Sequence, residues 1–177
     1  MATASRVSVQ EYLESDYEPE CELVGGALLP KPMGTLEHME MERWIERLLE
    51  RYEQRGLGRT VRELSIRHGD DVRVPDLVFV PPDARLEGGI MMAPPLLCVE
   101  ILSPSQRPSE LFARCETYHT WGVANSWVVD PIGKLAWEYH RGAPVRLLSE
   151  SDSLGAGERQ IGLSELFRQS QFDSTNS

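Results

Sequence analysis

The sequence contains no apolar run close to the ~20 residues that a membrane-spanning helix needs. Residues 1–16 also lack the apolar stretch of a signal peptide and become acidic at once. The three cysteines are odd in number, lie far apart and form no CxxC pair, which disfavours a disulfide framework or a zinc site. We therefore expect a cytoplasmic protein with reduced thiols and no membrane partner. A cysteine nucleophile stays open only at Cys115, because His119 follows it by one helical turn.

Lysine is also scarce: Lys31 and Lys134 are the only two lysines, and all the remaining basic residues counted with them are arginines. Arginine keeps its charge and can clamp a phosphate, but it is a poor proton shuttle. The formal net charge of −10 disfavours broad, non-specific binding of nucleic acid, which depends on neutralising many phosphates. A local site could still bind one phosphodiester through a metal ion and an arginine. Glycine-rich phosphate loops and the GxSxG and HExxH motifs are absent.

Two apolar, β-branched stretches are the strongest strand signals, at residues 72–80 (VRVPDLVFV) and 95–102 (PPLLCVEIL). Each carries one acid among its apolar residues, Asp76 in the first and Glu100 in the second. A buried carboxylate costs several kcal/mol unless it is paired, protonated or bound to a cation. If the strands are neighbours, the two acids predict a divalent-metal site. The alternative is that an arginine or a turn amide satisfies each acid at a strand end.

At 177 residues the chain suits one domain, which we place at 1–170, followed by a loose tail at 171–177. Helices are expected at 8–15, 35–54, 109–121 and 163–167, and further strands at 21–24, 27–29, 60–67, 126–129, 135–140 and 145–148. Residues 81–94 are expected to form a loop and residues 151–157 a polar linker. The charged residues of helix 35–54, Glu42 among them, are interpreted as a solvated face.

Two further charged residues have open roles. Glu63, in strand 60–67, either lies across a hairpin from Asp76 as a third acid, or is an exposed acid paired with an arginine or solvent. Arg114 lies at the edge of the apolar face of helix 109–121, one turn from Leu111 and Tyr118. It points either toward the two acids or into solvent, beside Glu110.

The order of several motifs resembles the Uma2 family (DUF820) of the PD-(D/E)xK superfamily, over residues 8–139. The residues that carry the resemblance are CELVGG at 21–26, EH at 37–38, VPD at 74–76, VEILSPS at 99–105, ELFAR at 110–114, Tyr118, GV at 122–123 and WVVDP at 127–131.

This resemblance implies a restriction-endonuclease-like α/β fold, with a central mixed β-sheet flanked by helices and with N-terminal and C-terminal β-hairpins. It also implies a metal-dependent endonuclease that hydrolyses DNA or another nucleic acid, and a homodimer. Asp76 and Glu100 would hold Mg2+ or Mn2+ together with the carbonyl of Ile101, and we expect the two carboxylates within about 6 Å of each other. Glu22, His38, Glu63 and Tyr118 would line the pocket.

The chain departs from this pattern at the expected lysine. In the superfamily pattern a lysine follows the second acid by two residues, and this chain has Leu102 there. The resemblance to Uma2 proteins implies that the next helix supplies this lysine instead, at the position where this chain has Arg114. Arg114 is therefore the third expected catalytic residue, in place of lysine. The alternative, favoured by this replacement and by the negative charge, is an inactive member that acts as a binding or assembly module.

Overall fold

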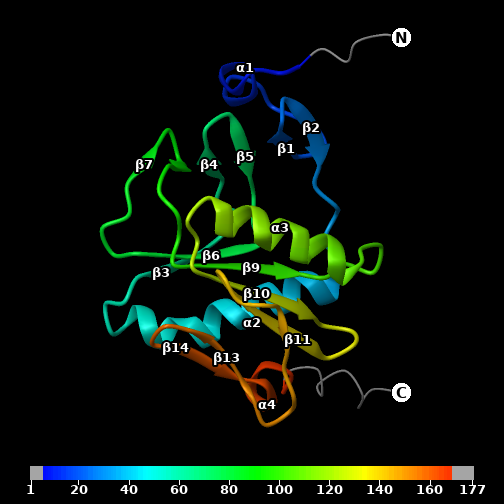
Figure 1. Ribbon diagram of the computed structural model, residues 1–177, viewed down its shortest axis with the longest axis vertical. Coiled ribbons are helices and arrows are strands. Elements are labelled where there is room, and N and C mark those ends of the chain that lie inside the picture. The colour runs from blue at the N-terminus through cyan, green and yellow to red at the C-terminus, as the bar shows by residue number, and fades with distance from the viewer. Residues whose placement is uncertain (1–5, 169–177) are drawn as a thin grey trace.

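A computed structural model describes residues 6–168 and shows two mixed β-sheets, a separate hairpin and four helices in this part of the chain (Figure 1). The central sheet has the strand order β12-β11-β10-β9-β6-β3. Its strands are β3 (Arg59–Arg62), β6 (Leu77–Val80), β9 (Leu97–Ile101), β10 (Asn125–Asp130), β11 (Leu135–His140) and β12 (Arg146–Leu147). Strands β9 and β10 run parallel, and the other neighbours are antiparallel. The expected α/β architecture with a central mixed sheet is confirmed.

The central sheet is covered on both faces, with α2 (Leu36–Glu53) on one side and α3 (Pro108–Thr120) on the other (Figure 1). Every residue of β6 and β9 is consequently buried, which explains their nearly continuous apolar sequences. Leu77 and Val99 pack toward α2, whereas Val78 and Cys98 pack toward the α3 side. Two acids in these surroundings therefore require specific partners.

The second sheet has the order β2-β1-β5-β4-β8-β7 and lies at the N-terminal end of the molecule, above α3 in Figure 1. Its strands are β1 (Cys21–Val24), β2 (Ala27–Pro30), β4 (Ile66–His68), β5 (Asp71–Arg73), β7 (Leu86–Glu87) and β8 (Ile90–Met91). The short helix α1 (Val9–Leu13) precedes it, and the Ser8 side chain accepts a hydrogen bond from the Glu11 N–H, as the capping pattern predicts.

Two predicted strands were wrong in the same way. Residues 72–80 form β5 and β6, and residues 60–67 form β3 and the start of β4, so in both cases the chain crosses between the two sheets. Pro75 explains the first break, because it has no N–H to donate to a central strand. Glu63 marks the second, with a φ of 50° that an extended strand does not allow.

The segments predicted to be irregular were also partly wrong. The loop at 81–94 contains the β7–β8 hairpin, and the linker at 151–157 lies largely in the hairpin of β13 (Ser153–Ala156) and β14 (Arg159–Gly162). Leu154, Ala156 and Ile161 alternate with exposed or half-buried residues and are buried in the same core as α2 and α4 (Leu163–Leu166). The predicted tail at 171–177 lies outside the described residues.

The long helices were predicted well, with one exception. Thr35 caps α2, and Met41, Ile45 and Leu49 form part of its buried face. Glu42 does not belong to a solvated face, because it is buried beside that apolar stripe. Among residues 6–168, no helix has the length and apolarity that crossing a membrane requires.

Candidate functional site

The site lies where the chain passes from the N-terminal sheet into the central sheet. Leu77 of β6 pairs with Val99 of β9, so the antiparallel register places Asp76 opposite Glu100, one residue further along. The Ile101 N–H donates to Asp76 Oδ2 at 2.7 Å, which fixes the Asp76 carboxylate beside the end of β9. Asp76 and Glu100 are both buried and line one small cavity of about 20 Å³. This volume is room for one or two water molecules.

Besides these two acids, the cavity is lined by residues from both helices that cover the central sheet and from the segment after β2. Lys31 and Pro32 come from the segment after β2, His38 comes from α2, and Arg114 comes from α3. The full lining is Lys31, Pro32, His38, Asp76, Glu100, Ser103, Gln106 and Arg114.

Arg114 points into the protein and is held there by Glu22 of β1. Its Nη1 and Nη2 atoms donate to the two carboxylate oxygens of Glu22 at 2.6 and 2.8 Å, a two-pronged contact of the strong kind. Arg73 and the Val74 N–H also donate to Glu22, at 2.8 and 2.7 Å. Burial raises the pKa of Glu22, but Arg114, Val74 and Arg73 outweigh burial and the net pKa is lowered. An exposed Arg114–Glu110 pair is therefore excluded.

Glu100 receives the remaining contacts of this group. Arg114 Nη2 lies 3.1 Å from Glu100 Oε1, and the Tyr118 hydroxyl donates to the same oxygen while it accepts a hydrogen bond from Arg114. Burial raises the pKa of Glu100 to about 7, since the charge of Asp76 adds to the effect and Arg114 offsets only part of it. Glu100 thus holds its proton more tightly than an ordinary glutamate does.

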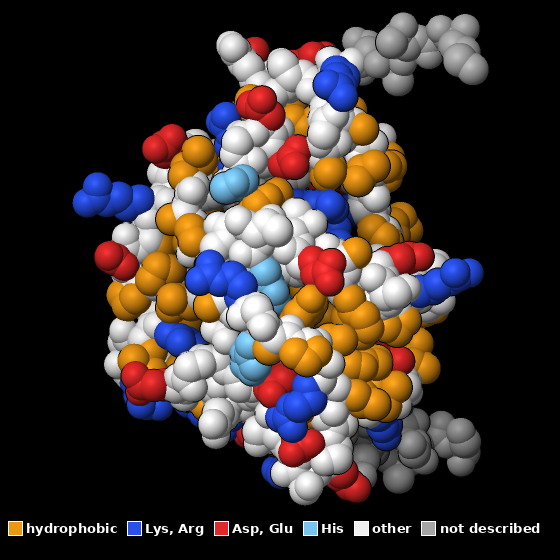
Figure 2. Space-filling view, in the orientation of Figure 1, with side chains coloured by type: hydrophobic (Ala, Val, Ile, Leu, Met, Phe, Trp, Pro, Cys, Tyr) orange, Lys and Arg blue, Asp and Glu red, His pale blue; other side chains and the backbone are white. Residues whose placement is uncertain are grey.

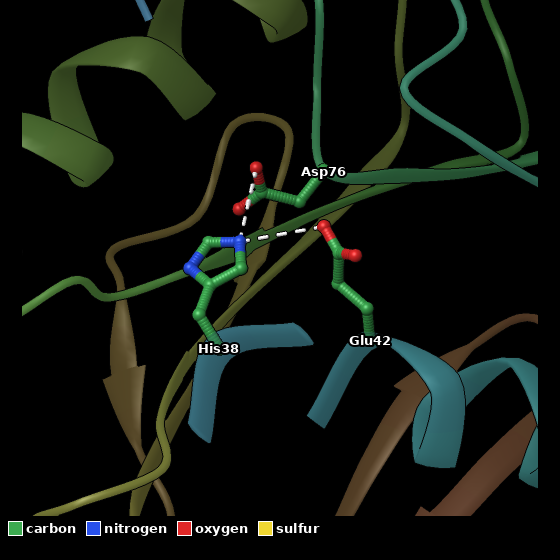
Figure 3. A group of neighbouring side chains, drawn as sticks. All are labelled: His38, Glu42 and Asp76. Carbon is green, nitrogen blue, oxygen red and sulfur yellow. Dashed lines mark ion pairs between the residues drawn. The ribbon is translucent and has the colours of Figure 1, made fainter. Parts of the chain in front are cut away.

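Asp76 faces a second group of side chains on α2 (Figure 3). His38 Nε2 lies 3.5 Å from Asp76 Oδ1 and 3.3 Å from Glu42 Oε1, and the ligand atoms of the three residues all lie within 4.8 Å of one another. The other ring nitrogen of His38 lies 3.3 Å from the Ser103 hydroxyl. Burial lowers the pKa of His38, but the carboxylates of Asp76 and Glu42 outweigh it and raise the pKa to about 9.

Glu63 lies outside the pocket lining. Its side chain is 57% exposed, and it pairs with Lys31 Nζ at 3.2 Å, although its backbone N–H donates to the Asp76 carbonyl. The structure thus matches the exposed alternative for Glu63, but with Lys31 in place of an arginine or solvent. Glu42 and Lys31 were not anticipated. The spacing of His38 and Glu42 on one helix was a usable signal for the first, whereas no local pattern identified Lys31.

The family model of Uma2, described as "Putative restriction endonuclease", matches residues 9–168. The chain belongs to the Uma2 family. A solved structure entitled a "putative nuclease belonging to DUF820", from Anabaena variabilis, is similar to this Uma2 protein with a TM-score of 0.80. The two chains are 21% identical, and the match covers 92% of this chain and 98% of that chain, so the likeness establishes the fold. A search of curated proteins found no match.

The side chains of this Uma2 protein suit a divalent cation. Carboxylate oxygens are the preferred ligands of Mg2+ and Mn2+, and the imidazole of His38 suits transition metals. Four buried carboxylates, those of Glu22, Glu42, Asp76 and Glu100, are paired with Lys31, His38, Arg73 and Arg114. Because the pKa values of His38 and Glu100 are raised, to about 9 and about 7, a cation bound here would displace their protons.

Proposed function

We propose that this Uma2 protein is a metal-dependent endonuclease that hydrolyses phosphodiester bonds of nucleic acid. Asp76 and Glu100 would hold Mg2+ or Mn2+ with the carbonyl of Ile101, and His38 and Glu42 would supply further ligand atoms beside Asp76. The observation that carries the proposal is that two buried acids, one directly before β6 and one in the neighbouring strand β9, line one cavity together with an arginine. The family description adds independent support.

A divalent cation held by these residues would polarise a phosphate and lower the pKa of a water molecule. The side chains have separable tasks. The Ile101 N–H orients Asp76, while Tyr118 and Arg114 orient Glu100. Arg114 is in turn fixed by Glu22, so its role is to position Glu100 and to balance charge.

The substrate contact is proposed to be local. On the face shown in Figure 2, acidic and basic side chains are interspersed, and there is no continuous basic surface along which a nucleic-acid backbone could bind. Together with the net charge of −10, this favours recognition of one accessible phosphodiester over binding along a duplex. We also propose that the protein forms a homodimer, and a light-scattering measurement of its mass in solution tests this.

The second candidate is an inactive member that uses the fold as a binding or assembly module. One observation favours it: Arg114, which replaces the usual lysine, is engaged by Glu22, Glu100 and Tyr118. The buried charges of this site are already paired within the protein, so they need no substrate to neutralise them.

Cleavage assays separate the two candidates. Plasmid DNA and a single-stranded RNA are incubated with the protein in Mg2+, Mn2+ or EDTA, together with Asp76→Asn and Glu100→Gln variants. Asp83, an exposed acid of the 81–85 segment, provides the control variant Asp83→Asn. We expect metal-dependent cleavage that each site variant lowers more than about 100-fold, beyond the effect typical of outer-shell changes. Wild-type protein that cleaves neither substrate with either metal would favour the inactive module.

A further inference from the structure

The lysine missing from the expected positions has a counterpart elsewhere in the site. Lys134 lies exposed in the turn between β10 and β11, whereas Lys31 lines the cavity with Asp76 and Glu100. The side chain of Lys31 is only 11% exposed, and its Nζ atom lies 3.8 Å from Asp76 Oδ1. Of the two lysines, Lys31 is therefore the one that lies at the site.

Arg114 is poorly suited to contact a substrate. Its Nη1 and Nη2 atoms donate to Glu22, and Nη2 also donates to Tyr118 and is ion-paired with Glu100. Its Nε atom is buried without a hydrogen-bond partner within residues 6–168. Moving the guanidinium toward a phosphate would leave Glu22 with fewer donors in a buried position, which is costly. Arg114 thus lines the cavity with its guanidinium already bound to Glu22 and paired with Glu100, so it balances charge there.

Lys31 has donors to spare. Its ammonium carries three N–H groups, and one of them bonds to Glu63 Oε1 at 3.2 Å. The 3.8 Å separation from Asp76 is an ion pair that is too long for a direct hydrogen bond. Glu63, the partner of Lys31, adopts an uncommon φ of 50° and donates its N–H to the Asp76 carbonyl. Such backbone strain is typical of positions where precise placement matters.

We infer that Lys31 is the catalytic cation of this protein, and that its ammonium contacts the scissile phosphate and the attacking water in place of the absent lysine. This inference rests on the proposed nuclease function. In hydrolysis the water oxygen bonds to phosphorus, the P–O bond to the leaving oxygen breaks, and a proton from the water reaches the leaving oxygen through solvent. Lys31 stays protonated throughout and stabilises the negative charge that grows on the phosphate oxygens.

The competing role for Lys31 is structural, as a bridge between Glu63 and Asp76. Two measurements separate the roles, because a structural bridge affects stability and a phosphate contact affects nucleic-acid binding. Losing one phosphate contact lowers the slope of log affinity against log salt concentration by about 1. Losing a bridge alone leaves that slope unchanged.

The experiment compares Lys31→Met, Lys31→Gln and Lys31→Arg with the matched control Lys134→Met. Folding is checked by thermal denaturation, and Lys31→Gln replaces Lys31→Met if the latter does not fold. Two quantities are measured for each variant. The first is the rate of plasmid DNA cleavage in Mn2+. The second is the salt dependence of binding to a fluorescein-labelled DNA duplex in Ca2+. We expect the neutral variants to lose about 100- to 1000-fold in cleavage rate, as for removal of one charge-stabilising donor, and to lower the salt slope by about 1. Lys31→Arg should retain the slope, and Lys134→Met should match wild type.

Two failures are distinguishable. In the first, Lys31→Met or Lys31→Gln keeps the wild-type cleavage rate and salt slope while Asp76→Asn is inactive. This result would overturn the role of Lys31 and leave the nuclease function standing. A wild-type protein without any metal-dependent cleavage would overturn both.

Discussion

Replacing Arg114 with methionine is the most informative perturbation of the site's own architecture. Within residues 6–168, the change leaves Glu22, whose side chain is 2% exposed, with only Arg73 and the Val74 N–H as donors. It leaves the Glu100 carboxylate with the Tyr118 hydroxyl as its one hydrogen-bond donor in the same part of the chain. Removing one partner of a buried ion pair costs about 3–5 kcal/mol. Because Arg73 and Val74 still hold Glu22, we expect the lower end, about 3 kcal/mol.

The assay is urea unfolding, with thermal denaturation as a second readout. For a chain of this size, a loss of about 3 kcal/mol lowers the melting temperature by roughly 6–12 °C. Arg47, an exposed arginine of α2, gives the control Arg47→Met, which should change the free energy of unfolding by less than about 0.5 kcal/mol.

A double-mutant cycle identifies the cause of the loss. Adding Glu22→Gln to Arg114→Met removes the charge that the first change leaves underpaired, so the two changes should couple by about 0.5–3 kcal/mol. Arg114→Lys keeps the charge but loses the two-pronged contact, and we expect it to cost about 1.5 kcal/mol. An Arg114→Met protein within about 0.5 kcal/mol of wild type would refute the reasoning that this ion pair holds the site together.

Three further predictions follow from the same structure. Because the pKa values of Glu22 and Asp76 lie below their ordinary 4.5 and 3.8, the stability they contribute is present above those values and is lost as pH falls through the folded-state pKa values; unfolding free energies measured in steps of pH should fall on the acid side, and an acid limb no flatter in Glu22→Gln would contradict this. The pKa of His38 is raised from 6.5 to about 9, so its contribution is complete below 6.5 and is lost as pH rises through about 9; His38→Gln should flatten the alkaline limb, and an unchanged limb would argue against the contacts with Asp76 and Glu42. In the C-terminal hairpin, Leu154→Ala should lower the unfolding free energy by about 2–5 kcal/mol, and a change below about 1 kcal/mol in urea unfolding would show that this hairpin packs loosely.

The acids of the site were predictable because they conflict with their surroundings. Asp76 and Glu100 interrupt apolar strand patterns, and a carboxylate in such a place needs a partner whatever the fold is. Helical spacing placed Tyr118 on the apolar face of α3 and Arg114 at its edge but left the direction of Arg114 open. Their assignment to the site came from the resemblance to the Uma2 family.

Glu42 and Lys31 were not predictable in the same way. Glu42 is one of several acids on α2, and only the tertiary contact with His38 and Asp76 distinguishes it from its exposed neighbours. Lys31 lies in an irregular segment after β2, where no periodicity relates the chain to the site. Its position depends on how the N-terminal sheet meets the central sheet.

The strand breaks show the same limit with a different cause. Pro75 carried a readable signal against a continuous strand, because proline cannot donate to a sheet. The break at Glu63 carried none, because glutamate has no preference for a positive φ, and the contacts of Glu63 with Asp76 and Lys31 are seen only in the fold. Local sequence thus identified most elements but not where the chain changes sheets.

Calorimetric titration with Mn2+ tests the central claim that Asp76 and Glu100 form a cation site. Wild-type protein should bind Mn2+ saturably, and the affinity should rise with pH as Glu100 and His38, with pKa values of about 7 and 9, lose their protons. Asp76→Ala should abolish this binding, and Asp83→Ala should leave it unchanged. Wild-type protein that takes up no Mn2+, or Asp76→Ala protein that binds it as tightly as wild type, would contradict the account.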